Sequence, residues 1–195
     1  MRVIETKVFT FEELNSEARK KAIESLQHVN VKHDFWHDNA IDDAKQIGAL
    51  MGIDIDEVHF SGFWSQGDGA CFTGTYAYKK GSVKAVKEYA PRCEEVHSIA
   101  ERLSSIQKDN FYKLEATIKH SGHYYHEYCT DIDVRKDDNY PSDAVIIEVA
   151  DCLRDYMRWI YRQLEQEYDY QTSDEAIIDT IEANEYEFTE EGKQI

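Results

Sequence analysis

Two histidines that flank a short turn have the spacing best suited to chemistry. His120 and His123 stand on either side of Ser121-Gly122, and in a tight β-hairpin their Cβ atoms would face each other roughly 5 Å apart. Such a pair can bind a transition metal, but a tight site needs three or four ligands, and strand alternation sends His126 to the opposite face. The pattern therefore favours a surface histidine pair. A metal site and a pH-sensitive contact stay as alternatives, and no cofactor is predicted.

Glu127 is a second weak candidate for chemistry. The register of the same hairpin would place Glu127 opposite Ala116, on the buried face. A carboxylate there needs a partner, or its pKa rises. Together with His120 and His123, this residue would form the site of a small metal-dependent hydrolase, which is the main alternative to a binding function.

Other reactive residue types lack the patterns of known catalytic sites. His33 and His37 are four residues apart but lack the Glu that follows the first His in zinc proteases. Gly67-Asp68-Gly69 is followed by no helix start and no Lys-Ser/Thr pair, so it is typical of a turn. The four cysteines form no C-x-x-C pair, and no Ser or Cys has a local nucleophile signature. We therefore predict no catalytic residues and a protein that is not an enzyme.

An aromatic hairpin is a candidate contact surface. Phe63, Trp64 and Phe72 lie close in sequence to Gly62 and Gly74, and a glycine inside a strand lets another group approach closely. The three aromatic residues are therefore predicted to contact a partner, with packing inside the protein as the alternative.

The chain ends in an acidic stretch. From Gln163 to Gly192 there are eleven acidic residues and no Lys, Arg or His. Such a stretch forms either a solvated face that aids solubility or a surface that docks on basic grooves made for nucleic acid. The second reading assigns partner binding to all eleven: Glu165, Glu167, Asp169, Asp174, Glu175, Asp179, Glu182, Glu185, Glu187, Glu190 and Glu191.

The overall charge narrows the choice of partner. The net charge is -17, from 39 acidic and 22 basic residues, which disfavours direct binding to nucleic acid and to anionic membranes. Met1–Thr10 alternates polar and apolar residues and holds no apolar run long enough for a signal peptide or a membrane span. We therefore expect a cytoplasmic protein with free thiols, whose partner has a basic surface.

The elements that position these residues include several helices. Apolar residues recur at helical spacing over residues 16–25, 34–50, 83–89, 94–107, a long stretch after Pro141, and 173–183. In the long helix, the apolar stripe predicts core packing, and Arg154, Arg158 and Arg162 on the polar side predict ion pairs on a solvated face.

Strand patterns complete an α+β fold. Strands are expected over Arg2–Phe9, in hairpins over residues 57–78 and 111–134, and around Tyr186 and Phe188. The result is an antiparallel sheet of four to five strands, with the N-terminal strand at an edge, packed against helices. With no linker pattern, one domain over residues 1–195 is predicted.

Three stretches of the chain resemble a family of small acidic proteins encoded by bacteriophages and prophages. They are Phe11–Ala18, Phe60–Phe72 and the C-terminal stretch formed by Tyr168–Ile178 and Ile181–Lys193, together with Trp36 and Asp43–Gly48. The resemblance implies no catalytic residues. It implies an accessory protein that binds and inhibits a host nuclease, a restriction system or a CRISPR complex, in some cases by imitating DNA. An antitoxin-like partner of a basic toxin is a related alternative.

Overall fold

The chain folds into two compact units. The computed structural model describes residues 7–195, and for Asp34 the backbone alone. The sheet unit comprises Asn39–Glu165, and the terminal unit comprises the described residues up to Asp38 together with Gln166–Ile195. Each unit has its own cluster of buried apolar side chains. The single domain predicted from the sequence is thus divided into two apolar cores.

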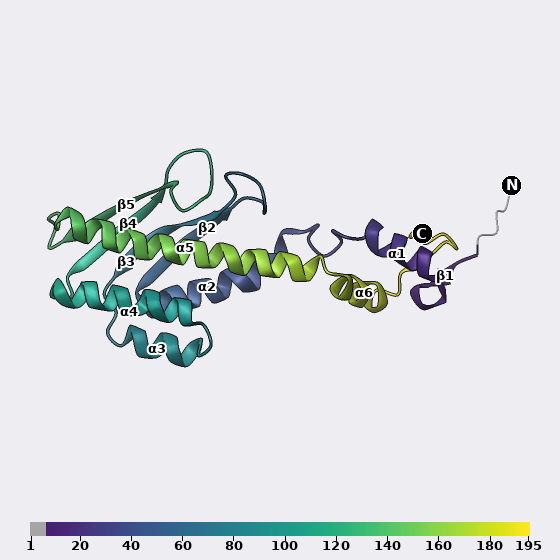
Figure 1. Ribbon diagram of the computed structural model, residues 1–195, viewed down its shortest axis with the longest axis horizontal. Helices are drawn as coiled ribbons and strands as arrows, with labels where there is room; N and C mark the ends of the chain where they lie inside the picture. The colour runs from purple at the N-terminus through teal and green to yellow at the C-terminus, as the bar shows by residue number, and fades with distance from the viewer. Residues whose placement is uncertain (1–6) are drawn as a thin grey trace. The chain divides into compact units, whose positions relative to one another are not determined.

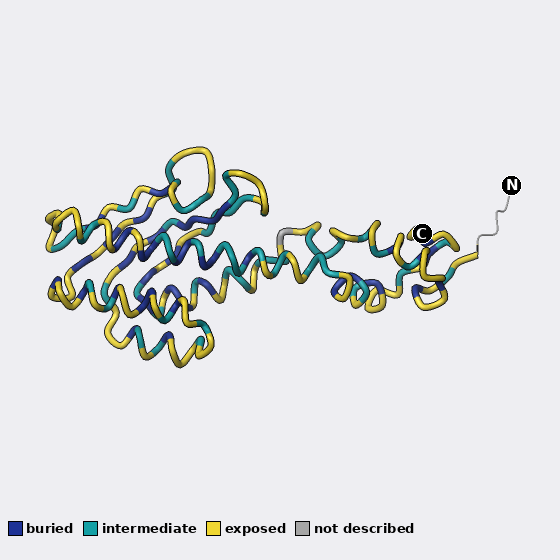
Figure 2. Tube along the Cα trace, viewed as in Figure 1, coloured by how far each residue is buried: buried dark blue, intermediate teal, exposed yellow. Residues whose placement is uncertain are grey.

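Four antiparallel strands form the main sheet, in the order β2-β3-β4-β5 (Figure 1). Their bounds are Ile53–Phe60 (β2), Ala70–Ala77 (β3), Leu114–His120 (β4) and Thr130–Lys136 (β5). Along β4, Leu114, Ala116 and Ile118 are buried and the residues between them are exposed, so the sheet has one apolar face. Figure 2 shows this burial along the strands and the helices that face them. The α+β fold predicted from the sequence is confirmed.

Helices cover the apolar face of the sheet (Figure 1). They are α2 (Asp38–Met51), α4 (Glu94–Asp109) and α5 (Asp143–Gln171), with α3 (Ser82–Tyr89) packed on α4. The predicted apolar stripe of α5 is confirmed as core, since Val149, Leu153, Met157, Ile160 and Leu164 are buried. In the described part of the chain, no helix combines the length and apolar character needed to cross a membrane.

The terminal unit is built around two capped helices, α1 (Ser16–Ser25) and α6 (Asp174–Ala183). The side chain of Asn15 caps α1 and that of Ser173 caps α6. The 3-10 helices η1 (Phe11–Glu13) and η2 (Asp34–His37) and the strands β1 (Phe9–Thr10) and β6 (Glu187–Phe188) complete the unit. Its core consists of Phe11, Leu14, Ala18, Ala22, Ile177, Ile181 and Phe188.

The first predicted strand differs from the structure. Residues 2–6 of the predicted strand Arg2–Phe9 lie outside the described residues. The described β1 pairs with β6, with Phe9 opposite Phe188, and adds no strand to the edge of the main sheet. Phe188 is buried, and its ring lies 6.2 Å from that of Phe11, measured between centroids. This apolar contact favours a separate two-stranded sheet of β1 and β6.

The connection between β4 and β5 is a loop, and the tight turn predicted at Ser121-Gly122 is wrong. His120 pairs with Thr130, and the backbone N–H of Ser121 donates to the carbonyl of Cys129 at 2.8 Å. Residues 121–129 therefore form a long loop closed at its base.

The apolar residues of β5 explain this register. Ala116 lies opposite Val134 and Ile118 lies opposite Ile132, which places the apolar residues of both strands on the same face. The pairing of Ala116 with Glu127 predicted from the sequence would have left Val134 out of the core, and it is wrong.

Candidate partner-binding surfaces

The outer side of α6 carries four exposed carboxylates: Asp174, Glu175, Asp179 and Glu182. With about 100° between successive residues of a helix, these positions fall on one side. Ala176, Ile177 and Ile181 fall on the other side and are buried. The helix therefore presents an acidic face while its apolar face builds the terminal core.

Five more exposed carboxylates of the terminal unit extend this charge: Asp169, Glu185, Glu187, Glu190 and Glu191. We call these five and the four of α6 the acidic surface. Glu167 is half-buried and accepts a hydrogen bond from the Gln171 amide at 2.8 Å. Glu165 is half-buried and belongs to the sheet unit. Ten of the eleven predicted carboxylates thus belong to the terminal unit.

The carboxylates of the acidic surface lack salt bridges within the described part of the chain, although Lys21 interacts electrostatically with Glu191. None of its nine carboxylates makes a salt bridge with any residue that the structure describes. Like charges four residues apart, such as Glu175 and Asp179, destabilise a helix by roughly 0.2–0.5 kcal/mol per pair. The resulting negative potential would attract a cationic partner.

The β2–β3 loop exposes one of the predicted aromatic residues. Trp64 is 69% exposed and has a left-handed φ of 70°, which is uncommon for a bulky residue. Phe63 is half-buried, with its ring stacked on Tyr161 of α5 at 5.5 Å. The Tyr161 hydroxyl donates to the carbonyl of Gly62 at 3.2 Å. Helix α5 therefore anchors this loop.

Phe72 is a core residue, and its assignment to a contact surface is wrong. Its side chain has no exposed area, and its ring meets Tyr156 of α5 edge-on, with centroids 6.2 Å apart. Phe72 shares its side of β3 with the buried residues Gly74 and Tyr76. Strand alternation therefore directs it toward the helices and away from a partner.

The β4–β5 loop packs on the β2–β3 loop at two glycines. A Cβ atom at Gly69 would lie 2.6 Å from the Cβ of His126, and one at Gly67 would lie 3.5 Å from the Tyr124 ring. Tyr124 and Tyr128 are 57% and 67% exposed. Packing between the loops thus accounts for Gly69.

His120 and His123 do not face each other as a metal-binding pair. Nε2 of His120 donates to the carbonyl of Tyr124 at 2.9 Å, and its ring lies 5.4 Å from that of His59 and 5.1 Å from that of Tyr125. The His123 ring contacts Tyr124 instead. Within residues 7–195 no group of three or more His, Cys, Asp or Glu side chains is arranged to hold a metal ion. The hairpin geometry predicted for this pair is wrong.

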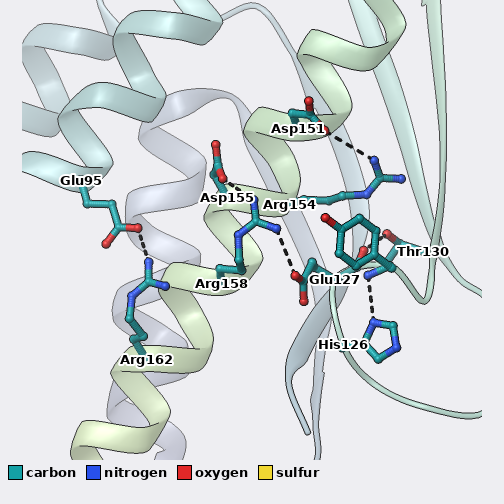
Figure 3. A network of polar contacts seen from close by, with 10 residues as sticks. Glu95, His126, Glu127, Thr130, Asp151, Arg154, Asp155, Arg158 and Arg162 are labelled. Atoms are coloured by element: carbon teal, nitrogen blue, oxygen red, sulfur yellow. Dashed lines mark hydrogen bonds and ion pairs between the residues drawn. The ribbon is translucent and has the colours of Figure 1, made fainter. Parts of the chain in front are cut away.

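Glu127 has a partner that sequence reasoning missed. Its carboxylate accepts a hydrogen bond from Arg158 of α5 at 3.0 Å (Figure 3). Arg158 also pairs with Asp155, which accepts a further hydrogen bond from Arg102 of α4. The chain of contacts links the β4–β5 loop through α5 to α4.

The neighbouring arginines of α5 extend this network (Figure 3). Arg162 pairs with Glu95 of α4, and Arg154 pairs with Asp151 at 3.8 Å. The Arg154 guanidinium also lies 5.4 Å from the centre of the Tyr128 ring. The ion pairing predicted along α5 is confirmed, but the predicted solvated face is not, since the side chains of Arg154, Glu127 and Asp155 are 23%, 18% and 28% exposed. The contacts join α5 to the β4–β5 loop and to α4.

Acid should lower the folding stability of the sheet unit by protonating Asp155. Burial opposes ionisation of this carboxyl, but hydrogen bonds from Arg102 and Arg158 outweigh it and lower its pKa below the ordinary value of 3.8. A lowered folded pKa contributes stability above the unfolded pKa, and this stability is lost as the pH falls through the folded pKa. Arg158→Met removes one of the two arginine donors to Asp155. We therefore expect the stability of this variant to depend less on pH than that of the wild type below about pH 4. Urea unfolding at neutral and acidic pH tests this. An unchanged pH dependence, equal to that of wild type and of Arg154→Met, would contradict it.

The buried cysteines are unsuited to nucleophilic chemistry. Burial raises the pKa of the Cys71 thiol to about 12 and that of Cys152 to about 11. A protonated thiol is a poor nucleophile. Cys93 and Cys129 are half-buried, and all four are free. Core packing therefore explains Cys71 and Cys152.

Comparison with known proteins identifies a family and no activity. No curated protein and no solved structure matches the chain. Residues 36–174 match DUF8835, a domain of unknown function. The matched segment contains the sheet unit and ends at the first residue of α6, so most of the acidic surface follows it. This protein belongs to the DUF8835 family.

Proposed function

We propose that this protein acts by binding another protein, and that its acidic surface docks on a basic surface made for nucleic acid. The observation that supports this most directly is the set of nine exposed carboxylates without a salt bridge in the described terminal unit. Their mutual repulsion costs folding stability. A cationic partner would offset that repulsion and would gain electrostatic steering during association.

The spacing of the charges suits a site that normally binds a phosphate backbone. Side chains three or four residues apart on α6 lie roughly 5–6 Å from each other, so the helix offers a row of closely spaced anions, as a nucleic-acid strand does. The partner would therefore be a nuclease, a restriction or CRISPR component, or another nucleic-acid-handling protein. The resemblance to small acidic phage proteins favours a host defence protein in the bacterial cytoplasm, and an antitoxin-like role toward a basic toxin would use the same contacts.

The exposed loop aromatics are proposed as a second contact. Trp64, Tyr124 and Tyr128 are each more than half exposed, and aromatic side chains of this kind supply much of the affinity at protein interfaces. Anchoring of both loops to α5 by Tyr161 and Arg158 would lower the entropic cost of binding there.

Neutralising the outer side of α6 should greatly reduce binding. The test captures partners of the tagged protein from a bacterial lysate at low and high salt and identifies them by mass spectrometry. The variant combines Asp174→Asn, Glu175→Gln, Asp179→Asn and Glu182→Gln. We expect the wild type to retain a basic nucleic-acid-binding protein that salt or added DNA displaces, and the variant to recover at least about tenfold less of it, since four interfacial charges are lost.

A charge-matched control separates this surface from net charge. Asp54→Asn, Glu115→Gln, Asp131→Asn and Asp138→Asn remove four exposed carboxylates of the sheet unit, and this control should recover the partner as the wild type does. The proposal fails if the α6 variant binds the same partner undiminished, or if DNA does not compete for it.

A further inference from the structure

A groove in the terminal unit has an apolar floor and an acidic rim. It has a volume of about 480 Å³ and lies between the Thr10–Glu12 segment and the end of α6. Phe11 and Ile181 are 8% and 1% exposed and form the floor with the half-buried Tyr186. The rim carries four exposed carboxylates: Glu12, Glu182, Glu185 and Glu187.

The end of α6 builds this groove through a specific backbone motif. The N–H of Tyr186 donates to the carbonyl of Ile181, and the N–H of Glu185 donates to that of Glu182, each at 3.1 Å. This pair of bonds is a Schellman motif, which packs the residue at Tyr186 against the residue at Ile181. The motif therefore forms the floor and brings two carboxylates to its edge.

Glu185 occupies the position in this motif that glycine normally takes. Its φ is 51°, in the left-handed region, which is unfavourable for a residue with a Cβ atom. A glycine there would close the helix with less strain. What the glutamate adds is a carboxylate at the groove, beside those of Glu182 and Glu187.

The charges around the groove leave it strongly negative. No salt bridge with a described residue involves Glu12, Glu182, Glu185 or Glu187. The nearby cation Arg19 lies 5.7 Å from the centre of the Phe11 ring, and its guanidinium donates to the backbone carbonyls of Phe11 and Glu12. Among the described residues that line the groove there are thus four carboxylates and no cation.

We propose that this groove receives an arginine side chain from a basic segment of the partner. The inference rests on the proposed function and names the group that the acidic surface would recognise. An arginine stem can cover the apolar floor while its head stays at the rim. The planar guanidinium can bond carboxylates in pairs and stack on the Tyr186 ring, which a lysine ammonium does less well.

Binding of a fluorescent oligoarginine peptide, followed by anisotropy, tests the groove. The groove variant combines Glu182→Gln, Glu185→Gln and Glu187→Gln, and the α6 comparison variant combines Asp174→Asn, Glu175→Gln and Asp179→Asn. We expect the groove variant to lose at least about tenfold in affinity and the α6 comparison variant to lose clearly less. The wild type should bind oligoarginine more tightly than oligolysine of equal length. The sheet-unit control Asp54→Asn, Glu115→Gln and Asp131→Asn should bind as the wild type.

The variant Glu185→Gly tests whether affinity can be lost without a loss of stability. Glycine suits the left-handed backbone at this position, so this variant should unfold at no lower temperature than the wild type and still bind the peptide several-fold less tightly. If the groove variant and the α6 comparison variant lose peptide affinity equally, the groove is not the arginine site. The proposed binding role of the acidic surface would still stand. A wild-type protein that does not bind oligoarginine would also contradict the proposed arginine site. The proposed function is tested separately, by the capture of a partner from lysate.

Discussion

Phe72→Ala should lower the free energy of unfolding by about 3–5 kcal/mol, because truncating a buried Phe removes apolar contacts and leaves a cavity. The Phe72 ring is fully buried and lies between β3 and α5, edge-on to Tyr156. Tyr156 itself has no exposed area and donates a hydrogen bond to the carbonyl of Ala44. The cavity would therefore open where strand, α5 and α2 meet, and little relaxation could fill it.

Trp64→Ala is the matched control for this prediction. Trp64 is another aromatic of the same hairpin region but is 69% exposed, so its truncation should change stability by no more than about 1 kcal/mol. Urea unfolding followed by far-ultraviolet circular dichroism measures both variants without relying on tryptophan fluorescence. Equal stability of the two variants would show that Phe72 is not a core residue and would restore it as a candidate contact.

The difference between these two residues shows which part of the surface the sequence could predict. A hairpin with Phe63, Trp64 and Phe72 is recognisable from composition, yet the face to which each side chain points depends on where the strand begins. Here β3 begins at Ala70 and alternation places Phe72 with Gly74 and Tyr76 on the helix side. Local signals fix the presence of a strand better than they fix its buried face.

The helices were predictable because their signals are local. The apolar stripe of α5 and the caps Asn15 and Ser173 depend on residues within one or two turns. The β4–β5 loop was not predictable in this way. Its tyrosines have high strand propensity, and the contacts that hold it as a loop come from distant residues, such as Arg158 to Glu127 and the space that Gly69 leaves for His126.

The candidate site likewise has one part that the sequence predicts locally and one part that depends on distant residues. The acidic residues could be named from the sequence, because a run of carboxylates without cations is a property of composition. The groove could not, because its helix ends in a Schellman motif at Glu185, where the usual glycine signal is missing. The Phe11 side of the groove comes from the opposite end of the chain, and no local pattern links it to α6.

Gly74→Ala should lower the free energy of unfolding by about 2–4 kcal/mol, since the change combines backbone strain with a steric overlap. Gly74 has a φ of 151°, and a Cβ atom there would lie 2.0 Å from the carbonyl oxygen of Asp54 in the neighbouring strand. The register of β2 against β3 shifts immediately after the Ile55–Gly74 pair, as at a β-bulge. The group that approaches this glycine closely is therefore the backbone of β2, where sequence reasoning had left room for a partner.

Gly62→Ala is the control for Gly74→Ala. It shows whether any glycine-to-alanine change in this hairpin lowers stability or only the one at Gly74. Gly62 is exposed, and the nearest atom to an added Cβ would be a carboxylate oxygen of Asp68 at 3.6 Å, which is an ordinary contact. Its stability should stay within about 0.5 kcal/mol of the wild type. If both alanine variants unfold at the same urea concentration, the close approach of β2 to Gly74 does not exist, and Gly74 would again be open to contact with a bound partner. If only Gly74→Ala is weakened, this glycine serves the sheet, and partner contacts in the hairpin are restricted to the loop around Trp64.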